Sequence, residues 1–216
     1  MATIVGRQLK RRLAVPYGCY KLATKRGSFI HESGWLESIR TSTPCDQSGS
    51  PVPWMNYSVV EFLRERLQPG FRVFEYGSGY STCFFASLCQ TVISVEYDKA
   101  WLDRVRQMIP TNARVIHQEK DVDGEYCRTI HQVDGNFDIV LVDGRDRVHC
   151  VAQAVSCLTG EGVLLLDDSD RPRYRKAVDQ LTQEGFRNLK FSGLKPGNPC
   201  RTETTVFYRD HNCLGI

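Results

Sequence analysis

The sequence predicts an α/β protein with a doubly wound, Rossmann-like sheet of seven mostly parallel strands and helices on both faces. Three observations support this fold class. Short apolar segments alternate with segments of helical periodicity between residues 57 and 184. Two apolar segments hold uninterrupted aliphatic runs, residues 139–142 and 163–166, which are typical of strands buried on both faces. The last two, residues 187–192 and 204–209, have no helix between them and should form an antiparallel hairpin.

The elements before the hairpin follow one another as strand–helix units. The first helix is predicted at residues 57–67, because apolar residues recur there at helical spacing and Pro69 and Gly70 end the segment. We place the strands at residues 72–76, 92–96, 113–117, 137–142 and 162–167. We place the connecting helices at residues 81–89, 99–108, 148–158 and 171–184, with a shorter one within residues 124–132.

The chain divides into a basic N-terminal extension, residues 1–53, and a main domain, residues 54–216. Its 216 residues, 41% hydrophobic and 25% charged, suffice for one globular domain with an extension. Residues 1–31 carry seven Lys or Arg and no acid. Because the extension has few aliphatic residues, it cannot form a core alone. We expect it to be a lid over the ligand site or, alternatively, a helix packed on the back face of the sheet.

Charge and cysteine content exclude several classes of protein. A net charge of +3 is too small to indicate nucleic-acid binding, and no apolar segment approaches the roughly 20 residues of a membrane span. The nine cysteines include no Cys-x-x-Cys pair, which argues against a disulfide scaffold or a zinc site. Pro16 and Gly18 interrupt the apolar stretch after Arg12, so no signal peptide is expected. We expect a cytoplasmic protein with free thiols, no nucleic-acid partner and no transmembrane segment.

A Gly-x-Gly turn joins the first strand to the next helix, within the sequence Glu-Tyr-Gly-Ser-Gly-Tyr-Ser-Thr at residues 75–82. Such a turn exposes bare backbone to a ligand at a helix N-terminus. Thr82 replaces the third glycine of the dinucleotide fingerprint, and Glu75 would repel a pyrophosphate. An acid before the turn suits a cationic ligand, and S-adenosylmethionine carries an ammonium and a sulfonium. The alternative is a turn with glycines for packing alone.

The second strand ends at Glu96, nineteen residues after Gly77. An ionised carboxylate only accepts hydrogen bonds, so Glu96 could accept one from each hydroxyl of a ribose. The alternative is a solvated acid at the end of a strand. Together with the turn, Glu96 favours a ligand that contains an adenosine.

Three segments form a pattern that resembles a known family. They are Glu-x-Gly-x-Gly-x-Ser-Thr at residues 75–82, Val-Ile-Ser-Val-Glu at residues 92–96 and Phe-Asp-Ile-Val-Leu-Val-Asp-Gly at residues 137–144. The pattern resembles the class I S-adenosylmethionine-dependent methyltransferases and covers about residues 54–209. Pro-Trp-Met-Asn-Tyr at residues 53–57 and Thr-Val-Phe-Tyr-Arg at residues 205–209 are similar to a largely unassigned bacterial group of this family.

The resemblance implies a sheet order of 3-2-1-4-5-7-6 and a set of cofactor-binding residues. It implies methionine-side contacts from Glu75, Gly77, Ser78 and Gly79, together with Ser81 of the same motif, and ribose contacts from Glu96. It also implies an acid after the third strand for the adenine amine. We assign that role to Asp121, with Glu119 and Asp123 as alternatives.

Acids also follow the fourth and fifth strands: Asp143, and the pair Asp167 and Asp168. Neighbouring strands lie ~4.8 Å apart and ligands bind at their carboxyl ends, so these three carboxylates could converge around Mg²⁺. The arrangement is similar to the catechol-type O-methyltransferases, although Asp-Asp replaces their Asp-Asn pair and Asp146 replaces their lysine base. The alternative is that Asp168 or Ser169 caps the following helix, while Asp143 alone faces the substrate.

The sequence therefore favours methyl transfer from S-adenosylmethionine to a small-molecule or glycan-type acceptor at oxygen, with Asp143 taking or orienting the acceptor proton. Four arginines after the fourth and fifth strands could bind an anionic acceptor, or could be solvated partners of nearby acids. These are Arg145, Arg147, Arg171 and Arg173.

Two other functions remain open. One is an aminopropyltransferase that resembles the spermidine synthases, with Asp143 and Asp146 binding a polyamine. The other is a non-catalytic S-adenosylmethionine-binding module whose basic N-terminal segment is a docking arm or a membrane-surface helix. Base methylation is not favoured, because the Asn/Asp-Pro-Pro-Tyr/Phe motif is absent after the fourth strand.

Overall fold

The computed structural model describes the backbone of residues 4–216 and the side chains from residue 11 onward. A seven-stranded sheet runs through the main domain in the order β3-β2-β1-β4-β5-β7-β6, which confirms the predicted order. Its strands are β1 (Arg72–Tyr76), β2 (Thr91–Glu96), β3 (Ala113–His117), β4 (Phe137–Val142), β5 (Leu158–Asp167), β6 (Arg187–Lys195) and β7 (Asn198–Tyr208). Strands β1 to β5 pair in parallel, whereas β7 is antiparallel to both β5 and β6.

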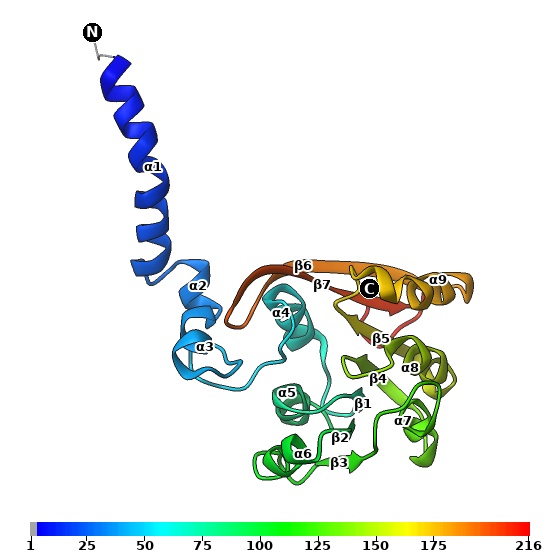
Figure 1. Cartoon of the computed structure of the whole chain (residues 1–216). Coiled ribbons are helices and arrows are strands. Elements are labelled where there is room, and N and C mark those ends of the chain that lie inside the picture. The colour runs from blue at the N-terminus through cyan, green and yellow to red at the C-terminus, as the bar shows by residue number, and fades with distance from the viewer. Residues whose placement is uncertain (1–3) are drawn as a thin grey trace.

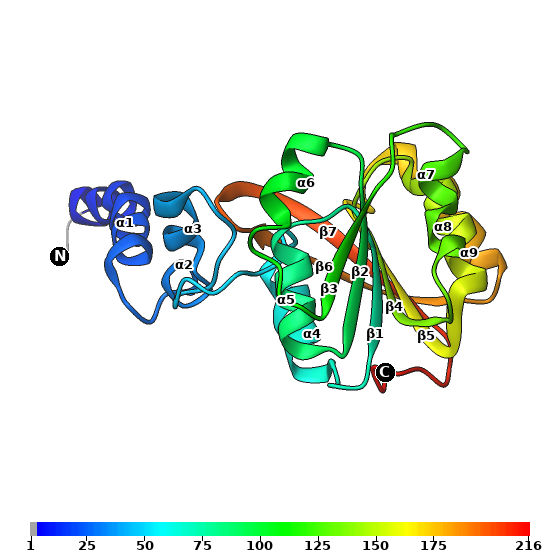
Figure 2. The same cartoon turned by 90° about the horizontal axis from the view of Figure 1, so that it is seen from below.

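Helices cover both faces of the sheet, as predicted. Figure 2 shows α4, α5 and α6 on one face and α7, α8 and α9 on the other. Their bounds are α4 (Tyr57–Arg66), α5 (Tyr80–Leu88), α6 (Lys99–Val105), α7 (Glu125–Arg128), α8 (Arg147–Ala154) and α9 (Arg175–Gln183). Short 3-10 turns follow α7 and α8 and precede α9, at Thr129–Gln132, Val155–Cys157 and Pro172–Tyr174.

The core forms two apolar layers, one on each face of the sheet. In β4, Ile139 and Leu141 join the cluster beneath α4 and α5, whereas Val140 and Val142 join the cluster beneath α7, α8 and α9. All four side chains are buried, which explains the uninterrupted aliphatic run in this strand. These layers hold the carboxyl ends of the parallel strands at one edge of the sheet.

The β6–β7 hairpin is longer than predicted and reaches the N-terminal extension. Its two arms pair as far as Lys195 and Asn198, beyond the part that joins β5. The indole nitrogen of Trp35 donates to the carbonyl of Asn198 at 3.0 Å, and that of Trp54 to the carbonyl of Pro196 at 2.9 Å. These bonds fix the tip of the hairpin against the extension.

The extension contains α1 (Ile4–Thr24), α2 (Phe29–Glu32) and α3 (Trp35–Thr41). Figure 1 shows α2 and α3 near the tip of the hairpin, whereas α1 projects away from the rest of the molecule. Within the described residues, no helix combines the length and the apolar character that crossing a membrane requires.

Candidate active site

A cavity of about 550 Å³ opens at the carboxyl ends of β1, β2 and β4. Six of the predicted site residues line it: Gly77, Ser78, Gly79, Ser81, Glu96 and Asp143. The extension contributes Pro44 to the wall, and Trp54, the residue directly after the extension, also lines the cavity. Ligands of open α/β sheets bind at this edge.

The Gly77–Gly79 turn brings backbone to the floor of the cavity. Gly77 has a φ of +98° and Gly79 a φ of +151°, conformations that other residues rarely adopt. A Cβ on Gly77 would lie 3.3 Å from the backbone of Gly144, and one on Gly79 would lie 3.1 Å from the Trp101 ring. Both glycines are therefore needed for the shape of the turn, and the space above it suits close approach by a ligand.

Glu75 lies beneath this turn rather than at the cavity wall. Its side chain is fully buried, and one carboxylate oxygen accepts a 2.7 Å bond from the Ser94 hydroxyl. The other oxygen, Oε1, has no hydrogen-bond partner. Burial raises the pKa of Glu75 above its usual value. An unpaired acid at this depth would be stabilised in its ionised form by a cationic ligand in the turn above.

Glu96 lies at the cavity wall and holds the turn and the end of β2 together. One carboxylate oxygen accepts from the backbone nitrogens of Tyr97 and Asp98, each at 2.9 Å. The other accepts from the backbone nitrogen and the hydroxyl of Ser78, at 3.2 and 3.1 Å. The Ser78 hydroxyl can rotate, so this oxygen can exchange a protein donor for a hydroxyl of a ligand.

Asp121 does not line the main cavity. Its carboxylate accepts from the backbone nitrogens of Glu125 and Tyr126, at 2.7 and 3.1 Å, at the start of α7. It lines a second hollow of about 470 Å³, which shares Arg145 with the main cavity. Neither alternative, Glu119 or Asp123, lines either hollow.

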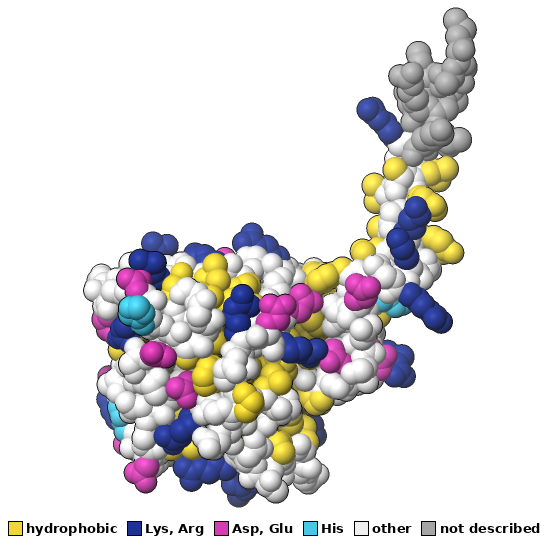
Figure 3. All heavy atoms as spheres, turned by 180° about the vertical axis from the view of Figure 1, so that it is seen from behind, with side chains coloured by type: hydrophobic (Ala, Val, Ile, Leu, Met, Phe, Trp, Pro, Cys, Tyr) yellow, Lys and Arg dark blue, Asp and Glu magenta, His cyan; other side chains and the backbone are white. Residues whose placement is uncertain are grey.

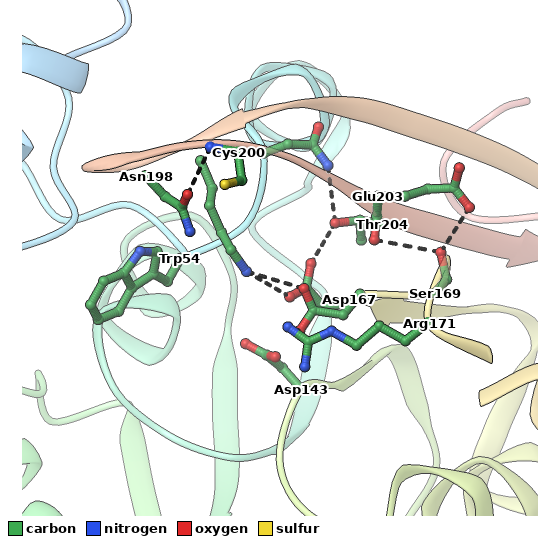
Figure 4. Close-up of polar contacts among 12 residues, drawn as sticks. Trp54, Asp143, Asp167, Ser169, Arg171, Asn198, Cys200, Glu203 and Thr204 are labelled. Atoms are coloured by element: carbon green, nitrogen blue, oxygen red, sulfur yellow. Dashed lines mark hydrogen bonds and ion pairs between the residues drawn. The ribbon is translucent and has the colours of Figure 1, made fainter. Parts of the chain in front are cut away.

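The structure brings the three predicted acids together. One carboxylate oxygen each from Asp143, Asp167 and Asp168 lies within 4.8 Å of the others. Asp143 reaches the cavity and is 30% exposed, whereas Asp167 and Asp168 are buried behind it. Figure 4 shows Asp167 between Asp143 and Thr204, whose hydroxyl donates to it at 2.6 Å.

Cationic side chains surround these acids. Arg147 donates to Asp143 at 2.7 Å and lies 3.6 Å from Asp168, and Arg171 pairs with Asp168 at 2.8 Å. The Lys195 ammonium, from the hairpin tip, lies 3.2 Å from Asp168 and 3.6 Å from Asp167. The acids and these cations balance in formal charge. As arranged, the residues do not fit Mg²⁺, because the ion would have to displace Lys195 or Arg147 from its carboxylates.

Two of these acids are harder to ionise than an ordinary aspartate. Burial, together with the charge of Asp143, raises the pKa of Asp167 to about 7. Burial also raises the pKa of Asp143, although the Arg147 guanidinium acts in the opposite direction. Asp143 is therefore a partly exposed acid whose proton affinity is above that of an ordinary aspartate.

Titration with Mn²⁺ is expected to show no saturable binding at sub-millimolar concentrations, because Lys195, Arg147 and Arg171 already pair with the acids. Electron paramagnetic resonance of added Mn²⁺ measures this directly. Saturable binding that disappears in Asp168→Asn would contradict this reading and restore the metal site predicted from the sequence.

Sequence reasoning did not identify Lys195, and it assigned Arg147 to a different role. Arg147 is neither a solvated partner of Asp146 nor a free anion-binding group, because it is buried and bonded to Asp143. Asp146 instead bonds His149 at 2.7 Å and accepts from the backbone of Asp123 at 2.8 Å. No local signal in the sequence indicates this contact, because Lys195 lies in the outer part of the hairpin, beyond the residues of β7 that pair with β5.

Comparison with known proteins gives matches in structure alone: no family model and no curated protein matches the chain. An rRNA methylase from Streptococcus thermophilus superimposes with a TM-score of 0.56 and 18% identity, over 70% of this chain and 95% of that chain. A Streptococcus mutans protein in complex with S-adenosylhomocysteine superimposes with a TM-score of 0.51 and 14% identity, over 69% of this chain and 94% of that chain. The chain has the class I methyltransferase fold.

The class I methyltransferase fold also occurs in a protein of different chemistry. Spermidine synthase from Thermotoga maritima superimposes with a TM-score of 0.54 and 12% identity, over 69% of this chain and 56% of that chain. The fold by itself therefore leaves open which group is transferred and to which acceptor. Those questions depend on the residues of the cavity.

Proposed function

We propose that the protein transfers a methyl group from S-adenosylmethionine to an oxygen atom of a small-molecule or glycan-type acceptor. The proposal rests mainly on one observation. The open Gly77–Gly79 turn lies between two carboxylates on a class I methyltransferase fold: that of Glu75 beneath it, one oxygen of which has no hydrogen-bond partner, and that of Glu96 beside it. Bound there, S-adenosylmethionine would supply an electrophilic methyl carbon.

The residues of the turn would orient this cofactor. The backbone of Gly77 and Gly79 and the hydroxyls of Ser78 and Ser81 would contact the methionine side of the cofactor, and Glu75 would favour its positive charges. Glu96 would accept from the ribose hydroxyls in place of the Ser78 hydroxyl. The adenine would extend toward the second hollow, where Asp121 is the proposed acceptor of its amine.

Asp143 is the proposed catalytic residue. It borders the cavity beside the turn, and its raised pKa suits a group that takes a proton from an acceptor hydroxyl. Arg147 fixes its orientation through the 2.7 Å bond. During transfer the acceptor oxygen would form a bond to the methyl carbon, the carbon–sulfur bond would break, and the hydroxyl proton would pass to Asp143.

Two features of the site disfavour a polyamine as the acceptor. Arg145 lines the cavity, where its guanidinium donates to the Tyr97 hydroxyl at 2.9 Å. Asp146 is turned toward His149 and does not join Asp143 in the cavity. The arrangement therefore disfavours the aminopropyltransferase alternative, which requires two acids facing one substrate.

Glu96→Ala is expected to weaken S-adenosylhomocysteine binding by about 1–3 kcal/mol, the cost of removing one partner of a charged hydrogen bond. Isothermal titration calorimetry measures the change. Glu96→Gln keeps one acceptor oxygen and should lose less affinity than Glu96→Ala. Glu65→Ala, on the exposed face of α4, is the control and should leave the affinity unchanged. Equal affinity in Glu96→Ala and wild type would remove Glu96 from the cofactor site.

The extension is proposed to act as a lid, because its Pro44 and the adjoining Trp54 line the cavity. Bound S-adenosylhomocysteine should slow proteolysis within residues 41–50, which mass spectrometry of the fragments would detect. Cleavage in the exposed turn at residues 134–136, at the opposite edge of the sheet, should not change. If the ligand leaves cleavage within residues 41–50 unchanged, as it does at residues 134–136, the lid is excluded.

A further inference from the structure

Helix α1 is a long element without packing partners over most of its length. Its 21 residues span roughly 31 Å at the α-helical rise, and every described residue from 11 to 24 is exposed. Figure 3 shows apolar and basic side chains side by side on this projecting helix. Because an unsupported helix is only marginally stable in water, we expect a partner to cover it.

The surface of α1 combines exposed apolar side chains with positive charge. Leu13, Tyr17 and Tyr20 recur at positions i, i+4 and i+7, so they share one face, and each is at least 57% exposed. Val15 and Leu22, on the opposite side of the helix, are also apolar and are 71% and 46% exposed. The basic residues in and just after the described part of the helix are Arg11, Arg12, Lys21, Lys25 and Arg26, and residues 1–31 contain no acid.

The helix is joined to the body by a defined connection. The Ser28 hydroxyl donates to the carbonyl of Leu22 at 2.7 Å, and the His31 ring nitrogen lies 2.8 Å from the carbonyl of Ala23. The last turn of α1 is thereby tied to the start of α2. A surface bound to α1 would therefore be held in a fixed relation to α2 and to the extension that follows.

We propose that α1 docks the protein on an anionic lipid surface, lying in the plane of the membrane interface. Lysine and arginine side chains are attracted to acidic headgroups, while the Leu13, Tyr17 and Tyr20 side chains of one face enter the boundary between headgroups and acyl chains. The extension also supplies Pro44 to the cavity wall, next to Trp54, so docking would place the cavity close to the membrane surface.

Other partners account for only part of this surface. A second copy of α1 would bring two helices with no acidic residue against each other, which like-charge repulsion opposes. A nucleic acid would pair with the basic residues and leave the exposed Leu13 and Val15 uncovered. A lipid surface with negative charge accounts for both the apolar and the basic side chains.

Sedimentation of the full chain with vesicles tests the proposal. Binding is expected to vesicles of phosphatidylcholine with phosphatidylglycerol and not to phosphatidylcholine alone. At about 1 kcal/mol per basic residue, the double variant Arg11→Gln, Arg12→Gln should partition on the order of 30-fold more weakly. Leu13→Ser, Tyr20→Ser should also weaken binding.

The control removes the same charge from the body of the protein, in Arg104→Gln, Lys176→Gln, and should change binding less than twofold. Equal losses in the control and the α1 variant would overturn the proposal, as would a lack of binding to phosphatidylglycerol vesicles. Tighter binding of a single-stranded RNA through Arg11 and Arg12, or a dimer lost on Leu13→Ser, would also overturn it. Binding of S-adenosylhomocysteine should be unchanged in all variants, which separates this proposal from the proposed function.

Discussion

Replacing Gly79 by arginine is expected to abolish binding of S-adenosylhomocysteine in isothermal titration calorimetry. A side chain at this position would meet the Trp101 ring, 3.1 Å from the Cβ, and would have to adopt a φ of +151°. The longer arginine side chain would also bring a positive charge to the place proposed for the sulfonium and ammonium groups.

Gly160→Arg is the matched control for this variant. Gly160 is exposed, and a Cβ there meets no atom within 4 Å. The Gly160→Arg variant should therefore bind S-adenosylhomocysteine as the wild type does. Normal binding by Gly79→Arg would show that the turn does not form the cofactor site, as would tight binding of NAD by a wild-type protein that does not bind S-adenosylhomocysteine.

Replacing Lys195 by alanine is expected to lower the free energy of unfolding by about 3 kcal/mol, because it leaves the buried Asp167 carboxylate without its cation. Asp167 and Asp168 are 1% and 4% exposed, and among the described residues Lys195 is the cation within 4 Å of the Asp167 carboxylate. Chemical denaturation at pH 7 measures the loss. Lys190→Ala, on the same strand, removes an ammonium that is 55% exposed and should cost less than about 1 kcal/mol.

The loss in Lys195→Ala should grow as the pH rises. The folded pKa of Asp167 is already raised to about 7, and removal of Lys195 raises it further. A raised carboxyl pKa gives a contribution to stability that is fully present below the unfolded pKa of about 3.9 and is lost as the pH rises through the folded pKa. The difference in free energy of unfolding between wild type and Lys195→Ala should therefore be larger at pH 8 than at pH 5, as measured by chemical denaturation at both values. Equal stability of Lys195→Ala and wild type at pH 8 would contradict the account of this cluster.

The sequence allowed the sheet to be predicted because its strands and turns carry local signals. The aliphatic run in β4 indicated a strand buried on both faces, and the lack of a helix between the last two strands indicated a hairpin. The length of the hairpin was underestimated. Its outer part is held by the indoles of Trp35 and Trp54, whose bonds to distant backbone carbonyls leave no periodic pattern in the sequence.

The site was predictable where it follows a strand end and not where it depends on distant packing. The turn, Glu96 and Asp143 lie at the cavity, as their positions after strands indicated. Glu75 does not line the cavity, because it lies within β1, one residue before the end of the strand. Its side chain points into the layer beneath α5. The pairing of Lys195 with Asp167 and Asp168 depends on where the hairpin tip lands, which neither local sequence nor the strand order specifies.

The central claim, that this cavity binds S-adenosylmethionine, is tested most directly by equilibrium binding to the wild-type protein. Titrations with S-adenosylmethionine, S-adenosylhomocysteine and NAD should be compared under the same conditions. We expect the first two to bind at one site and to compete with each other, with dissociation constants roughly between 1 μM and 1 mM, and NAD not to compete. No binding of either sulfur compound at millimolar concentration would contradict the proposed function.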